Sequence, residues 1–301
     1  MSPRSITKGL HFLLLLFCSV SSPAQSSGRL HTISRFSSTY VDARRIDVWL
    51  PAGYDSLSSK RYDVLYMHDG QNLFSRETAF GGEEWGVDEA VTRLTAGGKM
   101  RDCIVVGIWN TPKRFMEYAP AKPYHLLPAA KKTALKQERL ADTVLSDNYV
   151  LFLTRELKPF MDQTFKTKPG RKNTFIMGSS MGGLISLYAT LERPDVFGGA
   201  GCLSTHWPMS LKENDTEFVQ AFIRYFEQKY PGKEKPRLYF DYGTTTLDAW
   251  YEPHQKAMDE FLTRKKYGKK RWVSRKFEGA AHNEKAWRER LDIPLLFLLG
   301  K

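Results

Sequence analysis

The sequence predicts a single α/β domain, built on an eight-stranded, mostly parallel sheet with helices on both faces. Short apolar runs bounded by turn residues recur along the 301-residue chain and indicate strands. Helical patterns separate the later runs, which is typical of parallel strands joined by crossover helices. The first two runs follow each other closely, so we expect them to form an antiparallel hairpin. No internal repeat, low-complexity tract or interdomain linker is visible.

The alternation of apolar runs and helical patterns gives the bounds of each predicted strand and helix, in chain order. The predicted strands are residues 31–39, 44–50, 62–67, 103–109, 174–178, 199–203, 237–241 and 272–278. The predicted helices are residues 84–95, 146–164, 181–192, 212–229, 250–268 and 284–299. Residues 110–145 form the longest stretch without a strong pattern. A segment of this length is typical of a functional or disordered loop.

A serine occupies the turn between the fifth predicted strand and the helix that follows it. Ser180 is the central residue of Gly178-Ser179-Ser180-Met181-Gly182, which matches the pattern G-x-S-x-G. Between a strand and a helix, this pattern holds the serine in a strained conformation with its hydroxyl exposed. The flanking glycines are needed because side chains there would clash. We therefore expect Ser180 to be a nucleophile.

A nucleophilic serine needs a general base, and in this arrangement the base is a histidine. The histidines that follow Ser180 are His206, His254 and His282. His282 lies on a loop between the last predicted strand and the final helix, where such sheets place the base. We expect His254 to be helical and solvated. His282 is therefore the predicted base.

The acid that orients the histidine should follow the preceding strand, at residues 237–241. Two carboxylates compete for this role. Asp248 lies on the loop after the strand with freedom to reach the histidine, whereas Asp241 is the last residue of the strand. We favour Asp248, and we expect Asp241 to brace the loop by accepting backbone N–H bonds. Glu252 is a more distant third candidate.

The reaction of a serine nucleophile also needs an oxyanion hole made of two backbone N–H groups. The residue after the nucleophile, Met181, supplies one. The loop after the buried strand at residues 62–67 contains Gly70, which permits a tight turn, so we expect the Gln71 N–H to be the second donor. We expect His68, beside this loop, to be a structural hydrogen-bonding residue.

Four segments in order resemble the putative-esterase family of α/β-hydrolases. They are Val48-Trp49-Leu50-Pro51-Ala52-Gly53-Tyr54, Tyr66-Met67-His68-Asp69-Gly70-Gln71-Asn72-Leu73-Phe74, Gly178-Ser179-Ser180-Met181-Gly182-Gly183 and Gly279-Ala280-Ala281-His282. Relatives in that family include S-formylglutathione hydrolase, enterobactin-type siderophore esterases, feruloyl and acetylxylan esterases, and mycolyltransferases. The resemblance spans about residue 30 to the C-terminus.

This resemblance implies the α/β-hydrolase fold and a catalytic triad. By position, the triad falls on Ser180, Asp248 and His282, and Gln71 falls in the oxyanion hole. The acid is the loosest correspondence, because the loop that carries it varies between branches of the family.

Loops around the serine should set the choice of substrate. In the segment 110–145, Arg114 and Tyr118 are the expected polar and aromatic contacts. His206 and Trp207 follow the sixth predicted strand at the carboxyl edge of the sheet, where ligands bind, so they could line the site or be purely structural. Together with other aromatic residues they would form a rim suited to a sugar ring, an aryl acyl group or a catecholate. The aromatic residues of this rim are Trp109, Trp207, Trp250 and Tyr251.

The N-terminus resembles a targeting segment. Arg4 and Lys8 precede the apolar run at residues 12–17, and small residues precede Gln25. We expect residues 1–24 to be a signal peptide cleaved near Ala24/Gln25, and residues 25–301 to be a secreted or periplasmic esterase domain. The apolar run is too short for a mature transmembrane helix, so we expect no stable membrane anchor.

The charge and the cysteines of the chain limit which binding partners and which disulfides we expect. The formal net charge is +12, but the lysines and arginines are scattered, and export argues against a nucleic-acid partner. Cys103 and Cys202 fall in separate predicted strands, so we expect two buried free thiols. We expect no metal and no organic cofactor. The oligomeric state cannot be inferred from the sequence.

These features together predict an exported serine carboxylesterase that acts through an acyl-enzyme on a small-molecule or glycan ester. Carbohydrate-linked esters and siderophore esters are the leading substrate classes. The alternatives are acyl transfer to another hydroxyl group on the same fold, and a catalytically inactive binding protein. The filled triad positions argue against the last of these.

Overall fold

The computed structural model describes residues 28–138, 143–230, 232, 235–268 and 270–301. The predicted signal peptide, residues 1–24, lies outside the described residues. Within them, no helix is long and apolar enough to cross a membrane.

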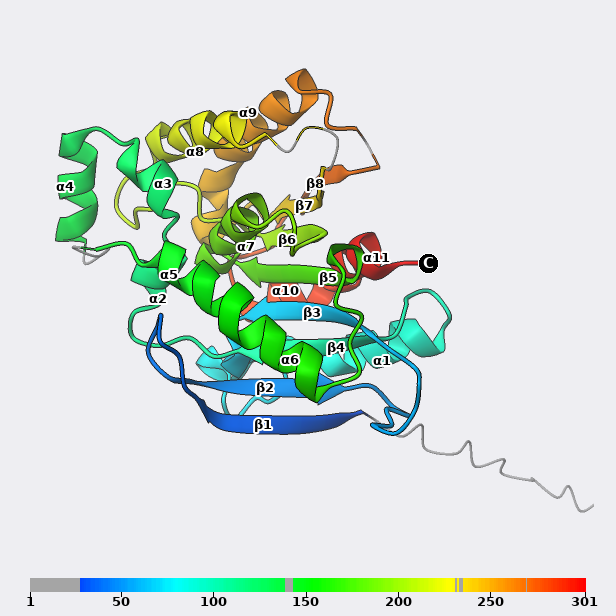
Figure 1. Ribbon diagram of the computed structural model, residues 1–301. Helices are drawn as coiled ribbons and strands as arrows, with labels where there is room; N and C mark the ends of the chain where they lie inside the picture. The colour runs from blue at the N-terminus through cyan, green and yellow to red at the C-terminus, as the bar shows by residue number, and fades with distance from the viewer. Residues whose placement is uncertain (1–27, 139–142, 231, 233–234, 269) are drawn as a thin grey trace, which may run out of the picture.

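The described chain forms an eight-stranded sheet with the order β1-β2-β4-β3-β5-β6-β7-β8. Its strands are β1 (Arg29–Phe36), β2 (Arg44–Leu50), β3 (Asp63–His68), β4 (Cys103–Ile108), β5 (Thr174–Ser179), β6 (Gly199–Leu203), β7 (Arg237–Tyr242) and β8 (Trp272–Lys276). β2 is antiparallel to both β1 and β4, and all later neighbours are parallel. The predicted α/β fold with its N-terminal hairpin is confirmed (Figure 1).

The burial of the strands explains their sequence pattern. Every residue of β3, β4 and β5 is buried, because helices cover both faces of the sheet centre. Such strands read as continuous apolar runs and not as an alternation. β1 is mostly exposed, as expected of an edge strand.

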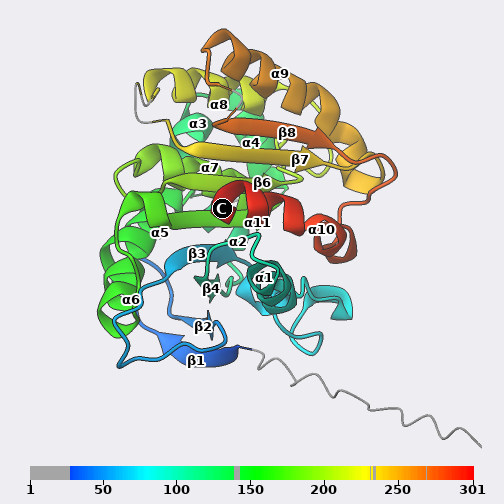
Figure 2. The same cartoon turned by 90° about the vertical axis from the view of Figure 1, so that its right-hand side faces the viewer.

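Two sets of helices cover the sheet (Figures 1 and 2). One face carries α7 (Met181–Glu192), α8 (Glu217–Gln228), α9 (Tyr251–Arg264) and the continuous helical rod α5 (Ser146–Leu151), η3 (Phe152–Leu157) and α6 (Lys158–Thr164). The other face carries α1 (Val87–Ala96), α10 (Glu284–Arg290) and α11 (Asp292–Leu299). The middle part of the rod, η3, is a π-helix.

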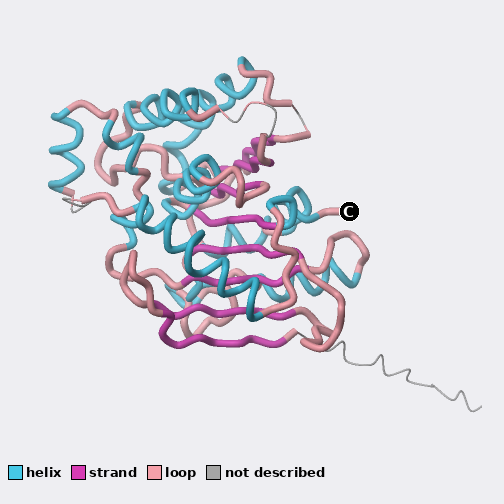
Figure 3. Tube along the Cα trace, viewed as in Figure 1, coloured by secondary structure: helices cyan, strands magenta, loops and turns pink. Residues whose placement is uncertain are grey.

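The structure differs from the predicted elements in three places. The final predicted helix divides at Leu291 into α10 and α11, because Pro294 has no N–H for the carbonyl of Arg290. The predicted loop 110–145 instead contains three short helices, visible as cyan turns in Figure 3. They are α2 (Arg114–Tyr118), α3 (Ala121–His125) and α4 (Ala129–Gln137). A short 3-10 helix, η5 (Thr246–Trp250), precedes α9, and two more, η1 (Gly70–Asn72) and η2 (Phe80–Gly82), follow β3. The last such turn, η4 (Arg171–Asn173), precedes β5.

The two described cysteines lie in neighbouring layers of the core. Cys103 is in β4 and Cys202 in β6, and both are buried free thiols. Burial raises the pKa of both thiols well above the usual range, so neither is a reactive thiolate.

Candidate active site

Ser180 lies at a strained turn between β5 and α7. Its backbone has φ 57° and ψ −123°, a conformation that a non-glycine residue adopts only when its surroundings impose it. The carbonyl oxygen of Ser180 accepts bonds from the N–H groups of Gly183, Leu184 and His206, which fix the turn. A Cβ on Gly178 would lie 2.9 Å from the carbonyl carbon of Gly182, so this position of the motif requires glycine.

His282 and Asp248 form a short hydrogen bond beside Ser180. The Nδ1 atom of His282 lies 2.6 Å from Oδ1 of Asp248. His282 and Ser180 line the same cavity. Because Nδ1 is held by Asp248, Nε2 is the nitrogen that can take a proton from the serine. The ring of His282 packs edge-on against Trp287, with 5.0 Å between ring centroids, which fixes its orientation.

The structure separates the two aspartates that compete for the acid role. Asp248 is buried and reaches His282, while its Oδ2 accepts bonds from Ser204 Oγ at 2.6 Å and the Gly243 N–H at 2.5 Å. Asp241 instead accepts bonds from the Ser204 N–H and from Arg290. Asp241 therefore accepts a backbone N–H bond as expected, but from the residue after β6 and not from the loop after its own strand. Glu252 forms ion pairs with Lys256 and Lys276 and does not contact the histidine.

A buried polar cluster holds Asp248 in place. Its centre is Ser204, whose Oγ accepts bonds from Trp287 Nε1 and from Arg290 Nη2, each at 2.9 Å. Arg290 also pairs with Asp241 at 3.0 Å. Sequence reasoning missed Ser204, Trp287 and Arg290. The only sequence signal was that Ser204 directly follows a strand at the carboxyl edge.

Two backbone N–H groups remain available for an oxyanion. Met181 is the first residue of α7, where N–H groups have no partner within the helix. Gln71 lies in η1, at the turn after β3. Neither N–H donates to another group in the described part of the chain. A Cβ on Gly70 would lie 2.6 Å from the Gly107 carbonyl carbon, so glycine is needed for this loop to approach β4.

Tyr251 lies against His282 and is not part of an exposed aromatic rim. Its hydroxyl is 2.8 Å from Nδ1 of His206, and its ring packs edge-on against His282 with 5.6 Å between ring centroids. Burial lowers the pKa of His206 to about 3, so its imidazole is neutral at physiological pH. Neutral His206 and Tyr251 therefore form an uncharged pair beside His282.

The cavity in front of Ser180 has a volume of about 380 Å³. Arg114 lines it, as expected, and binds Asp69 through two bonds of 2.7 Å. Burial acts to raise the pKa of Asp69, but Arg114 outweighs it, so the pKa lies below its usual range. Asn110 and Phe115, from the first part of the segment 110–145, also line the cavity, and the lining residues that sequence reasoning missed are Asn72, Phe80, Glu284 and Trp287.

The structure corrects four expectations about residues around the site. Tyr118 is fully buried beneath the Arg114 guanidinium, and Trp207 is buried in the core with its Nε1 bonded to Gln255, so neither can contact a substrate. His206 is also buried, and its side chain bonds to Tyr251. His254 is helical as predicted, but it is buried and not solvated, and its Nε2 bonds to Asn214. In each case tertiary packing buries the side chain. His68 is buried and bonds to Tyr149, in line with a structural role.

Two curated proteins resemble parts of the chain. An endo-1,4-beta-xylanase/feruloyl esterase of Xylanibacter ruminicola is 29% identical over 195 residues, which cover 62% of this chain and 23% of that protein. The protein YbbA of Bacillus subtilis is 25% identical over 166 residues, covering 54% of this chain and 58% of that protein. The chain therefore spans less than two thirds of the length of either relative.

Solved structures share the fold at lower identity. A ferulic acid esterase from Anaeromyces mucronatus has a TM-score of 0.58 at 23% identity, covering 92% of this chain and 91% of that one. The enterobactin esterase of Shigella flexneri has a TM-score of 0.63 at 18% identity, covering 91% of this chain and 59% of that one. At such identities the likeness concerns the fold.

A family model described as "Putative esterase" matches residues 37–298, nearly the whole described domain. The matched region contains the strained serine turn, the loop that carries Asp248, and His282. The chain therefore belongs to the "Putative esterase" family and has its α/β-hydrolase fold.

Proposed function

We propose that this protein is a serine carboxylesterase with Ser180, His282 and Asp248 as its catalytic triad. The observation that carries the proposal is the 2.6 Å bond between His282 Nδ1 and Asp248 Oδ1, beside a serine in a strained turn. This arrangement leaves one imidazole nitrogen for the serine and one cavity for the ester. Membership of the esterase family supports the same conclusion.

The proposed reaction proceeds in two balanced steps. His282 Nε2 removes the Ser180 proton as Oγ attacks the ester carbonyl carbon, and the N–H groups of Gln71 and Met181 bind the oxyanion. The C–O bond to the alcohol breaks, and the alcohol leaves with the proton from His282. Water then attacks the acyl-enzyme, with His282 again accepting and returning a proton. Asp248 stabilises the charged imidazolium.

We favour an aromatic acyl group linked to a carbohydrate as the substrate. Phe80, Phe115 and Trp287 line the cavity, and the side chain of Phe80 is 78% exposed, which is unusual for a large apolar residue. An exposed aromatic side chain at a cavity mouth suits a flat aryl group. The relative named feruloyl esterase supports this class. A siderophore ester is the second candidate, supported by the fold of the enterobactin esterase.

We further propose that residues 1–24 direct export and that the mature chain begins at Gln25. The charged and apolar pattern of this segment supports the proposal. N-terminal sequencing of the protein recovered from the periplasm or medium tests it. Recovery of the intact N-terminus only from the cytoplasm would contradict it.

The nucleophile is tested by comparing the wild type, Ser180→Ala and the exposed control Ser34→Ala. We expect hydrolysis of p-nitrophenyl acetate and labelling by a fluorophosphonate in the wild type and control. Both should be lost in Ser180→Ala, with turnover reduced by about 10⁴-fold or more. Mass spectrometry should place the label on Ser180. Retention of most activity in Ser180→Ala would refute the proposed mechanism.

Substrate class is tested on the same enzyme with methyl ferulate, feruloylated arabino-oligosaccharides, acetylated xylan and an enterobactin-type trilactone. We expect the largest kcat/KM on the feruloylated sugars. Phe80→Ala should raise KM for the feruloyl ester more than for p-nitrophenyl acetate, because only the larger acyl group reaches the cavity mouth. A higher kcat/KM on the trilactone would favour the siderophore class instead.

A further inference from the structure

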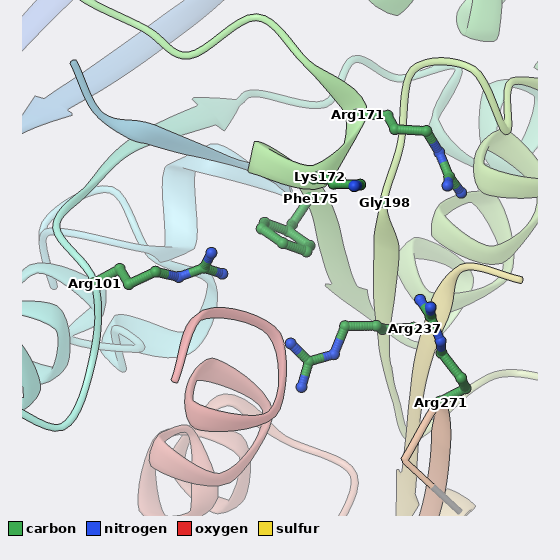
Figure 4. A pocket seen from close by; sticks show the side chains of 7 residues that line it. All are labelled: Arg101, Arg171, Lys172, Phe175, Gly198, Arg237 and Arg271. Atoms are coloured by element: carbon green, nitrogen blue, oxygen red, sulfur yellow. The ribbon is translucent and has the colours of Figure 1, made fainter. Parts of the chain in front are cut away.

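A second cavity lies at the opposite edge of the sheet and is lined almost entirely by cationic side chains. Its volume is about 340 Å³. Figure 4 shows Arg101 extending toward the Phe175 ring, while Arg237 extends toward α11 on the other side of the cavity. The lining residues are Arg101, Arg171, Lys172, Phe175, Gly198, Arg237 and Arg271, and none of these seven is acidic. We call this cavity the basic pocket.

The fold assembles the basic pocket from the amino ends of parallel strands. Arg237 is the first residue of β7, Phe175 is the second of β5, and Gly198 and Arg271 directly precede β6 and β8. Ser180 follows the opposite end of β5, whose six residues span about 20 Å at 3.3 Å per residue. An ester held at Ser180 therefore does not occupy this cavity, so the basic pocket is a separate site.

The charges of Arg101 and Arg237 are only partly compensated within the described part of the chain. Arg101 lies 3.2 Å from Asp63, but Asp63 also pairs with Lys168. Arg101 and Arg237 donate to carbonyl groups at the C-terminus of α11, where the helix dipole is negative. These contacts use only some of the five N–H groups that each guanidinium carries. Capping of α11 therefore explains part of the cluster but not the presence of Lys172 and Arg271 in the same cavity.

The repulsion within the cluster is visible at Arg237. Burial lowers the pKa of this guanidinium from its usual value, and the positive charges of Arg101 and Arg271 lower it further. A folded chain that brings like charges together in a half-buried cavity loses free energy unless an anion enters.

We propose that the basic pocket binds a small multivalent oxyanion made of two linked phosphate- or sulfate-type groups. The planar guanidinium fork matches the oxygen spacing of such groups and can bind them bidentately. The volume falls within the range of small-ligand sites and exceeds the size of a single such group. The ligand contacts Arg101, Arg237 and Arg271 and lies beside Lys172.

The test uses inorganic pyrophosphate as the probe, with calorimetric titration at fixed ionic strength and without divalent metal ions. The wild type should bind it with a dissociation constant below about 1 mM. Binding should raise the melting temperature by roughly 3 °C at millimolar probe. The double variant Arg237→Gln with Arg271→Gln should bind about tenfold more weakly or worse.

The matched control is Arg35→Gln with Arg264→Gln, which removes the same charge from exposed positions outside the pocket. It should bind pyrophosphate within twofold of the wild type. Equal losses in both double variants would mean attraction by net charge only and would overturn the proposal. So would a wild type that does not distinguish pyrophosphate from chloride at equal ionic strength.

One variant could fail for a structural reason, because Arg237 also caps α11. Arg271→Gln with Lys172→Gln, both exposed residues, avoids this and should weaken binding similarly. Circular dichroism checks that each variant is folded. None of these measurements depends on ester hydrolysis, so the proposal can fail or succeed independently of the proposed esterase activity.

Discussion

The two ends of the parallel strands differ in how their charged side chains are compensated. At the carboxyl edge, Asp248 and Asp241 are buried, yet each accepts short bonds from His282, Ser204 or Arg290. At the amino edge, the cations of the basic pocket line one cavity. The carboxylate beside it, Asp63, is shared between Arg101 and Lys168. A site that performs chemistry needs its charges arranged in advance. A site that captures an anion can leave positive charge uncompensated until the ligand arrives.

The largest expected effect is on the acid of the carboxyl edge. Asp248→Asn should lower kcat by about 10⁴-fold, because the amide no longer holds His282 in the correct tautomer. Asp241→Asn is the matched control, since Asp241 is equally buried but bonds to Arg290 and Ser204. It should retain kcat within about tenfold in folded protein. Esterase kinetics on both variants check this, and the reverse order would make Asp241 the acid.

The next effect concerns the hydroxyl that links the buried cluster. Ser204→Ala removes the donor to Asp248 and leaves Trp287 Nε1 without an acceptor. We expect about 2–3 kcal/mol less stability, from the buried group left unpaired, and about a tenfold loss of kcat. Urea unfolding and kinetics measure the two effects.

Ser210→Ala is the control, because Ser210 is also fully buried but bonds to Glu138 away from the cavity. It should lose stability without losing kcat. If Ser204→Ala keeps wild-type kcat, the cluster does not position Asp248.

A smaller effect, on the pH dependence of stability, is expected at Asp259, which forms no ion pair with the described residues. Burial raises the pKa of Asp259 on α9 from 3.8 to about 6, and hydrogen bonds from Gln255 and Ser274 only partly oppose this. The folded state therefore holds an extra proton between about pH 4 and 6, so stability falls as the pH rises through that window. Asp259→Asn should remove this pH dependence and add about 1–2 kcal/mol at pH 7, allowing for partial solvation. Thermal unfolding across pH 4 to 8 checks it, and an unchanged pH profile would contradict the assignment.

The smallest effect lies at the amino edge. Arg271 is exposed, and its guanidinium donates to the Lys235 carbonyl at 3.2 Å. Arg271→Gln should change the free energy of unfolding by no more than about 0.5 kcal/mol. In low salt the change should be an increase, because the repulsion between Arg271 and the other cations of the basic pocket is removed. Esterase activity should be unchanged. A loss above about 1 kcal/mol would mean that the chain itself compensates this charge, and it would weaken the contrast between the edges.

The sequence pattern predicted the strands and most helices to within a few residues, because burial on both faces leaves long apolar runs. It predicted Ser180 and His282 as parts of one site because a strand–turn–helix motif and the order of the later strands constrain both. It left Asp248 and Asp241 as competitors, since both follow the same strand. It misplaced Tyr118 and Trp207, because aromatic residues near a carboxyl edge can face the core or the cavity.

The sequence by itself determined the layered sheet, the serine turn, and the chain order in which acid and base follow the nucleophile. These depend on local periodicity, on glycines at positions where a tight turn leaves no room for a side chain, and on the direction of parallel strands. Tertiary structure alone decided which aspartate reaches His282, that Ser204 and Arg290 support it, and that Tyr251 packs against His282. It alone brought together the cations of the basic pocket, which the sequence scatters between residues 101 and 271. Such contacts depend on distances between strands that lie side by side in the sheet but far apart along the chain.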